Sequence, residues 1–304
     1  MSQHPVHRVK SIAEFHKMKE LPAPAHPLIS LFDYGAFECS TAIYHKHFVF
    51  DFYHISIKRS IGATFRYGQN HYDFDDGVMF FIAPNQVFGI ETIEEIAAAK
   101  SGWVLMIHPD FLWGTALAAG IKQYEFFDYA VHEALFLSEK EETVLNAIVR
   151  NIEQEYHGNP DSFSQGIIIS QIETLLNYSN RFYQRQFLTR KASNHKILAQ
   201  VEKIIEDYFD DEGTTGLPTV QYVAESLHLS PVYLSSLLKS VTGQTTQQHI
   251  HEKLIEKAKE KLSTTELTVS EIAFALGFEH SQSFSKLFKV KTSLSPLAFR
   301  SSFN

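Results

Sequence analysis

Short apolar runs separated by turn residues make up the first 130 residues, a pattern typical of β-strands. Phe48–Ile57 is rich in β-branched and aromatic residues, which favour strands. The polar residues 68–70 fit a hairpin connection, and Val78–Ala83 and Trp103–His108 each fit a buried strand that ends at a proline. Several short strands at this spacing predict a compact antiparallel barrel or sandwich.

The apolar period becomes helical near Ser138. Residues 138–141 fit a capping box, in which a serine hydroxyl and a glutamate carboxylate satisfy backbone N–H groups. Apolar residues then recur at spacings of three and four, and a second helix that opens near Asp161 repeats the pattern. These two stripes either pack on the first domain or form a dimer seam. The polar stretch 181–194 indicates a run into a linker and a hinge. The stripe residues are Leu145, Ile148, Ile152, Tyr156, Ile168, Ile172 and Leu175.

From about residue 195 the chain is helical and contains an internal repeat. Val223-Ala224 matches Ile272-Ala273 at an offset of 49 residues, and Leu234–Lys239 matches Phe284–Lys289 at an offset of 50. Each copy predicts a short helix, a tight turn and a second helix, which is the pattern of a helix-turn-helix. The alternative is a helical bundle with an accidental repeat.

The residues at the predicted turns and helix starts agree with this interpretation. Gly277 stands where the chain must turn sharply and suits a positive φ, whereas His228 occupies that position in the first copy. Ser230-Pro231 fits an N-cap followed by the first helical residue. Residues 245–248 and 268–271 fit two further helix starts.

Composition limits the class of protein. A length of 304 residues suits two domains, and 44% hydrophobic with 20% charged residues is ordinary for a globular chain. The net charge is −8, but residues 231–304 carry nine basic and six acidic side chains. The single Cys39 excludes an intrachain disulfide and a thiolate zinc site. We find no secretory signal and no apolar run long enough for a membrane, which predicts a cytoplasmic protein without a membrane partner.

The stretch Lys253–Arg300 closely resembles the signature of the AraC/XylS family of bacterial transcription regulators, and the resemblance covers roughly the last 100 residues. The family pattern usually has Gly where Thr292 stands and an aromatic such as Tyr where Phe299 stands. The first 190 residues resemble, more weakly, the regulatory half of such proteins. The matching landmarks are Ala258, Leu262, Val269, Ile272, Ala273, Gly277, Phe278, Phe284, Ser285, Phe288, Lys289, Ser295, Pro296 and Arg300.

The resemblance implies an α+β chain of three parts. Residues 1–130 would form a cupin-like β-barrel regulatory domain, residues 131–192 a helical hairpin and linker, and residues 193–304 an all-α DNA-binding domain with two helix-turn-helix motifs. It further implies a homodimer through residues 138–188, double-stranded DNA as partner, RNA polymerase as a further candidate partner, and activation as the usual direction of regulation. No cofactor is implied.

Two helix-turn-helix units on one rigid helix would place their recognition helices in successive major grooves, about 34 Å apart. Gln282 could pair with adenine, and Lys286 could donate to guanine. Solvent-facing positions of the two recognition helices are the candidate base readers: Val232, Tyr233, Ser235, Ser236, Gln282, Ser283, Ser285 and Lys286. Lysines and helix amino termini are the candidate phosphate contacts: Lys239, Thr245, Ser281, Lys289, Lys291 and Ser295.

For the amino-terminal domain we expect a sensor that holds a small polar effector between aromatic faces and His or Arg donors. A competing hypothesis is a cupin-type metal enzyme, because residues 45–47 have an H-x-H spacing. The acid that follows is Asp51, however, and Phe88 lies where a distant His would be expected, so we assign no metal and no catalytic residue. A ligand-independent regulator is the third hypothesis. The candidate effector residues are Tyr44, His54, Phe65, Arg66 and Tyr67.

Overall fold

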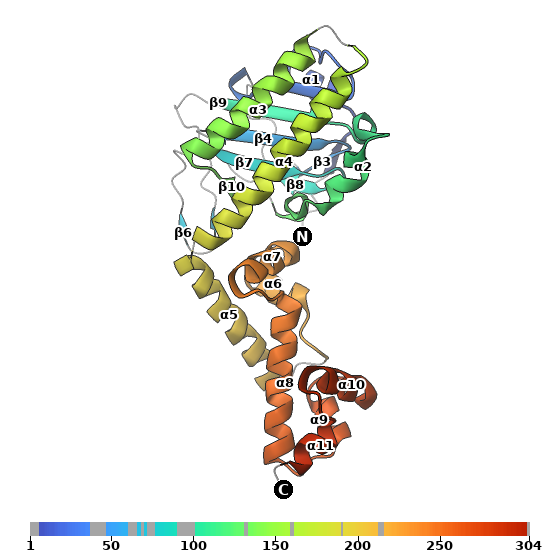
Figure 1. The fold of residues 1–304 in the computed structure, drawn as a ribbon, viewed down its shortest axis with the longest axis vertical. Helices are drawn as coiled ribbons and strands as arrows, with labels where there is room; N and C mark the ends of the chain where they lie inside the picture. The colour runs from blue at the N-terminus through green and yellow to red at the C-terminus, as the bar shows by residue number, and fades with distance from the viewer. Residues whose placement is uncertain are drawn as a thin grey trace. The chain divides into compact units, whose positions relative to one another are not determined.

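The computed structural model divides the chain into two compact units, residues 1–186 and 187–304 (Figure 1). The structure describes residues 6–36, 47–59, 66–67, 70–71, 77–89, 101–130, 133–158, 161–189, 191–211 and 216–302. The first unit combines strands and helices, and the second is helical in its described residues, which agrees with the expected α+β class.

The described residues of the first unit form three sheets. The largest is a five-stranded antiparallel sheet in the order β10-β7-β4-β9-β2, and a three-stranded sheet has the order β1-β3-β8. Among the described residues the strands close into no barrel, so the cupin-like barrel stays a prediction. The strands are β1 (Val6–Val9), β2 (Ile29–Asp33), β3 (His47–Phe50), β4 (Tyr53–Arg59), β5 (Arg66–Tyr67), β6 (Asn70–His71), β7 (Val78–Ile82), β8 (Val87–Gly89), β9 (Ser101–Ile107) and β10 (Leu135–Phe136).

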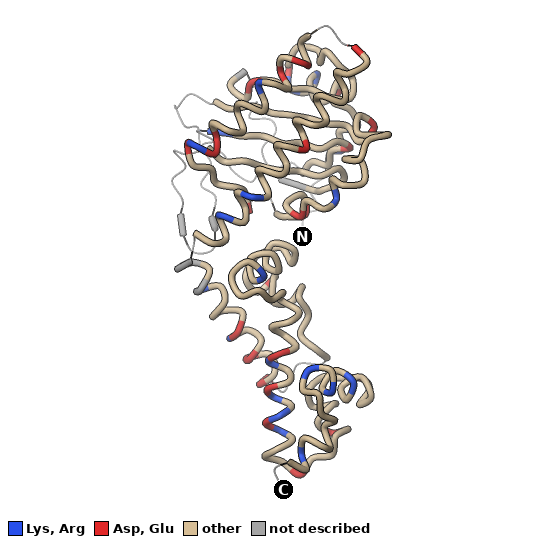
Figure 2. The backbone as a smooth tube through the Cα atoms, viewed as in Figure 1, with Lys and Arg blue, Asp and Glu red and all other residues tan. Residues whose placement is uncertain are grey.

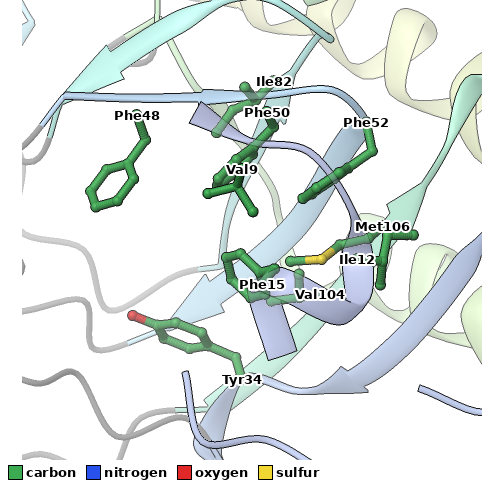
Figure 3. Packing of buried hydrophobic residues seen from close by; sticks show 10 residues of the cluster. All are labelled: Val9, Ile12, Phe15, Tyr34, Phe48, Phe50, Phe52, Ile82, Val104 and Met106. Atoms are coloured by element: carbon green, nitrogen blue, oxygen red, sulfur yellow. The ribbon is translucent and has the colours of Figure 1, made fainter. Parts of the chain in front are cut away.

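An aromatic core fills the space between the small sheet, helix α1 (Ile12–Met18) and one face of the large sheet (Figure 3). The rings of Phe50 and Phe52 stack with their centroids 4.9 Å apart, and Phe15 from α1 meets Phe50 edge-on at 5.6 Å. Met106 and Val104 of β9 close this core from the large sheet.

Helices α3 (Glu139–His157) and α4 (Ser164–Thr189) cover the other face of the large sheet (Figure 1). The indole N–H of Trp103 donates to Asn146 of α3 at 2.9 Å, and Arg59 of β4 pairs with Glu142 at 2.7 Å. Six of the seven residues of the two predicted stripes are buried, and Tyr156 is half-buried. The stripes therefore pack on the chain's own sheet, and a dimer seam made of these residues is excluded.

The second helix of this hairpin is longer than expected. Residues 181–194 were predicted to be a linker, but α4 continues to Thr189 and α5 begins at Lys191. This is a correction, and its physical reason is burial: Phe182, Tyr183 and Phe187 keep a helical apolar spacing among the polar residues. Short helices complete the first unit: η1 (Tyr34–Ala36), η3 (Pro109–Leu112), α2 (Ala116–Gly120), η4 (Ile121–Gln123) and η5 (Glu125–Asp128).

The second unit is helical throughout its described residues. A core from α8, α9 and α10 includes Leu254, Ile272 and Phe284, each with 0% of its surface exposed. No helix in the described ranges is both long and apolar enough to cross a membrane. The helices are α5 (Lys191–Asp210), α6 (Val220–Ser226), α7 (Pro231–Thr242), α8 (Thr246–Thr264), α9 (Val269–Ala275), α10 (Ser281–Thr292) and α11 (Pro296–Ser301).

Candidate nucleic-acid interface

Two helix-turn-helix units stand on either end of α8. Helices α6 and α7 form the first helix-turn-helix, and α9 and α10 form the second helix-turn-helix. The turn residues have the expected positive φ, at 56° for His228 and 89° for Gly277. A Cβ on Gly277 would lie 2.1 Å from the carbonyl oxygen of Gly216, so this turn admits only glycine, for space as well as for φ. The predicted pair of helix-turn-helix units is confirmed.

Side-chain hydrogen bonds fix the starts of α7, α8 and α9. The Ser230 hydroxyl accepts from the N–H of Tyr233 at 3.3 Å, with Pro231 as the first helical residue. Thr245 and Thr268 open α8 and α9 with complete capping boxes. These four-residue signals were predicted from sequence, and the structure confirms them.

The repeat extends further than the sequence comparison found. The hydroxyl of Thr242 donates to the carbonyl of Leu238 at 2.8 Å, and that of Thr292 donates to Phe288 at 2.8 Å. Each hydroxyl also accepts from a backbone N–H two residues on. The offset of 50 therefore continues past Lys289, and the shared threonine is the signal that could have revealed it.

Helix α10 presents a polar, cationic face. Gln282 and Lys286, four residues apart and therefore on one face, are both exposed, as is Lys289. Figure 2 shows lysines gathered on this helix. Burial, and then the charge of Lys291, lower the pKa of His251 on α8. Ser283 is exposed and Ser285 half-buried.

The lysines of α10 differ from those of α8 in their ion pairs. Lys253 and Lys257 of α8 are engaged by Glu206 and Asp210 of α5, the latter at 2.6 Å. In the described part of the chain, Lys286 and its two neighbouring lysines on α10 make no such ion pair. Their charge is therefore available to an external anion.

Helix α7 differs from α10, and two predicted base readers need correction. Tyr233 is only 1% exposed and packs its ring against Phe187 at 5.2 Å. Ser236 is 7% exposed and donates its hydroxyl to the carbonyl of Val232. Both face inward because the first helix-turn-helix buries the side of α7 that corresponds to the exposed side of α10. Val232 and Ser235 are half-buried.

The predicted phosphate contacts fall into two groups. Lys239 is exposed, like the lysines of α10. Thr245 and Ser295 are N-caps whose hydroxyls accept from backbone N–H groups within their own helices. Ser281 is the first residue of α10, preceded by His280 as an N-cap without a side-chain bond. These residues lie at helix amino termini, as expected, and their contact with phosphate stays a prediction.

Arg300 has a structural position that the sequence did not reveal. Its Nε donates to the carbonyl of Leu262 at 3.2 Å, and one of its terminal nitrogens donates to that of Leu267 at 2.6 Å. The side chain thus ties the end of α8 and the start of the second unit to α11. This arginine serves the fold of the second unit.

Of the predicted effector residues, His54 alone can be placed with its side chain. Tyr44 and Phe65 lie outside the described residues, and Arg66 and Tyr67 are described only as the backbone of β5. His54 is 6% exposed; burial, and then the charge of Lys58, lower its pKa to about 3.

Within the described part of the chain, the Nδ1 of His54 and the hydroxyl of Ser56, two residues along β4, have no hydrogen-bond partner. The two residues share one face of the strand, on which Ile82 and Met106 of the aromatic core flank His54. Over the same residues no group of three or more metal-binding side chains occurs, and residues 45 and 46 of the H-x-H spacing lie outside them.

The second unit is similar in sequence to known proteins. Residues 223–302 match the model of a family described as "Helix-turn-helix domain". The HTH-type transcriptional activator RhaS of Escherichia coli O139:H28 is 32% identical over 155 residues, which cover 50% of this chain and 52% of RhaS. YijO of Escherichia coli K12, an uncharacterized HTH-type transcriptional regulator, is 34% identical over 96 residues, or 32% of this chain and 34% of YijO.

Two solved domains are similar as well. The C-terminal domain of the response regulator yesN from Fusobacterium nucleatum is 36% identical and covers 33% of this chain and 93% of that domain, with a TM-score of 0.30. The corresponding domain of AraT from Geobacillus stearothermophilus is 33% identical and covers 35% and 84%, with a TM-score of 0.31. The chain thus spans about a third of YijO and half of RhaS. Residues 223–302 thus match a helix-turn-helix family, and this part of the chain is similar to HTH-type transcriptional regulators.

Proposed function

We propose that the protein is a sequence-specific DNA-binding transcriptional regulator that inserts two recognition helices into successive major grooves. The observation that carries this proposal is the exposed face of α10, where Gln282 and Lys286 stand beside further lysines without ion pairs in the described chain. Gln and Lys are side chains that pair with adenine and guanine in the major groove.

The length of α8 suits this mode of binding. Its 19 residues extend about 28 Å at 1.5 Å per residue. Successive major grooves on one face of a duplex are about 34 Å apart. A rigid spacer of this length, with one helix-turn-helix unit at each end, supports simultaneous contact with two grooves.

The two recognition helices contribute unequally. Lys286, Lys289 and Lys291 give α10 the charge for phosphates and the donors for base edges, and α7 carries Lys239 alone. Val232 and Ser235 remain its candidate readers, and both suit contact with thymine methyl groups or a reading of DNA shape. Helix α10 therefore sets most of the affinity.

An effector in the first unit is the finer part of the proposal. His54 and Ser56 offer two buried polar atoms on the core side of β4, and a buried polar atom without a partner costs free energy. A small polar molecule that bonds both would recover that cost and favour one state of the regulator. We further propose a homodimer through residues 138–188, by way of the outer faces of α3 and α4.

We propose activation as the direction of regulation, because the similar protein RhaS is named a transcriptional activator. RNA polymerase is the further partner proposed for this direction. The proposed place of action is the cytoplasm, where the DNA lies. A metal-dependent enzyme fused to a DNA-binding module is the alternative, and metal analysis of the purified protein separates the two.

Selection of sites from random duplex DNA by the full-length protein, at two salt concentrations, tests the proposal. We expect an extended motif with contacts in two adjacent major grooves and an affinity that falls steeply with salt. Failure of the full-length protein to enrich any motif at either salt concentration would contradict sequence-specific binding. The variant Glu202→Gln, on an exposed position of α5, serves as a control because it leaves both recognition helices unchanged.

A further inference from the structure

Tyr233 and Ser283 occupy equivalent positions in the two repeats, 50 residues apart, but differ in exposure. Ser283 is exposed on α10, whereas Tyr233 on α7 is 1% exposed. The first helix-turn-helix therefore needs a side chain that covers this position, and the second helix-turn-helix does not.

That cover comes from outside the helix-turn-helix. The ring of Phe187 lies 5.2 Å from that of Tyr233 at an interplanar angle of 73°, an edge-to-face arrangement that aromatic pairs favour. Phe187 is 1% exposed, and its carbonyl accepts from the side-chain amide of Asn194, which is itself buried. The end of α4 is thus held firmly around this ring.

The side chain of the preceding residue, Gln186, is also held. Gln186 is fully buried; its side-chain oxygen accepts from the N–H of Phe136 at 2.8 Å, and its side-chain nitrogen donates to the carbonyl of Ala134 at 3.2 Å. The last turns of α4 are therefore held by the side chain of Gln186 as well as by the carbonyl of Phe187.

We propose that Phe187, in the last turn of α4, is a positioning residue for the recognition helix α7. This inference rests on the proposed DNA-binding function. Among the described residues, the core around α10 consists of residues from 209 onward and contains neither Phe187 nor Tyr233. Phe187 would therefore act on one of the two recognition helices.

The test uses full-length variants on the site that the wild-type protein selects from random DNA. Phe187→Ala should weaken binding about tenfold or more, which is about 1.4 kcal/mol. Methylation interference should disappear in the groove read by α7 and remain in the groove read by α10. Phe187→Leu, which keeps apolar volume, should lie between Phe187→Ala and the wild type. Leu188→Ala is the matched control, because this neighbouring apolar side chain is 52% exposed.

A double variant and hydrogen exchange complete the test. Phe187→Ala combined with Tyr233→Ala should lose little more than either change alone, since both remove one contact. Amides of α7 should exchange faster in Phe187→Ala, whereas those of α10 should not change. Unchanged α7 exchange, unchanged or tighter binding with both grooves contacted, or loss of both grooves together would each overturn the inference. If the wild type selects no site, the proposed function fails, and the exchange result alone decides the role of Phe187.

Discussion

Gly243 and Ser293 occupy equivalent positions, 50 residues apart, and both adopt the left-handed conformation, with φ of 79° and 63°. Each ends a recognition helix, and each backbone N–H donates to a lysine carbonyl four residues back, Lys239 and Lys289. The two helix ends are therefore alike in backbone and differ in the residue that adopts it. A serine in this conformation carries a steric cost that a glycine avoids.

Ser293→Gly should therefore stabilise the end of α10 by about 0.5–1 kcal/mol. The converse change Gly243→Ser should destabilise the end of α7 by a similar amount, since nothing lies within 4 Å of an added Cβ and only the backbone conformation is strained. Native-state hydrogen exchange of the last amides of each helix measures both effects. If Ser293→Gly does not slow exchange at the end of α10, this account is wrong.

The lysines of α10 should separate into two kinds. Lys286→Ala should weaken binding to the selected site by about 1–3 kcal/mol and relax the preference at one base position. Lys289→Ala should weaken binding to all sequences alike and reduce the slope of log K against log salt by about 1.

Binding curves on cognate and random DNA over a salt series distinguish these outcomes. An equal loss on both DNAs for Lys286→Ala would mean that this lysine contacts phosphate. Lys259→Ala is the control, because Lys259 is an exposed lysine that belongs to α8 and to neither recognition helix.

Arg300→Ala should destabilise the second helix-turn-helix unit by about 1–3 kcal/mol, because two backbone carbonyls, of Leu262 and Leu267, lose their donors. Hydrogen exchange of the α9 amides measures the loss. Arg300→Lys should recover only part of it, since one ammonium cannot reproduce both bonds of the guanidinium. A salt slope changed as much as by Lys289→Ala, with stability unchanged, would instead assign Arg300 to phosphate.

His54 should make the stability of the first unit depend on pH. Burial lowers its pKa in the folded chain to about 3, whereas the unfolded chain takes up the proton near pH 6.5. Stability is therefore full above pH 6.5 and falls as the pH drops toward 3, by about 2 kcal/mol at pH 5. Urea unfolding followed by tryptophan fluorescence, at pH 7.5 and pH 5, measures the change.

The variant His54→Gln should lose this part of the pH dependence, because glutamine does not titrate. His280→Gln, at an exposed histidine of the second unit, should keep the wild-type difference between the two pH values. An identical difference in wild type and His54→Gln would exclude His54 as its source.

Local rules made the second unit predictable. The turns at Gly277 and His228 and the capping box at Thr268 depend on a few neighbouring residues, so the local sequence was enough to predict where these helices start and turn. The apolar stripes of α3 and α4 were equally visible. Whether they face a sheet or a partner depends on the covering surface, and the five-stranded sheet of the same chain supplies it.

Contacts between distant residues decided the rest. The sequence predicted Tyr233 and Ser236 on the exposed face of α7, by analogy with α10, but Phe187 from α4 covers Tyr233. Likewise, the carbonyl of Gly216 beside Gly277 makes that glycine irreplaceable for reasons of space, which no local pattern contains. Helical periodicity fixes which residues share a face, and only the packing of the whole unit fixes which face meets solvent.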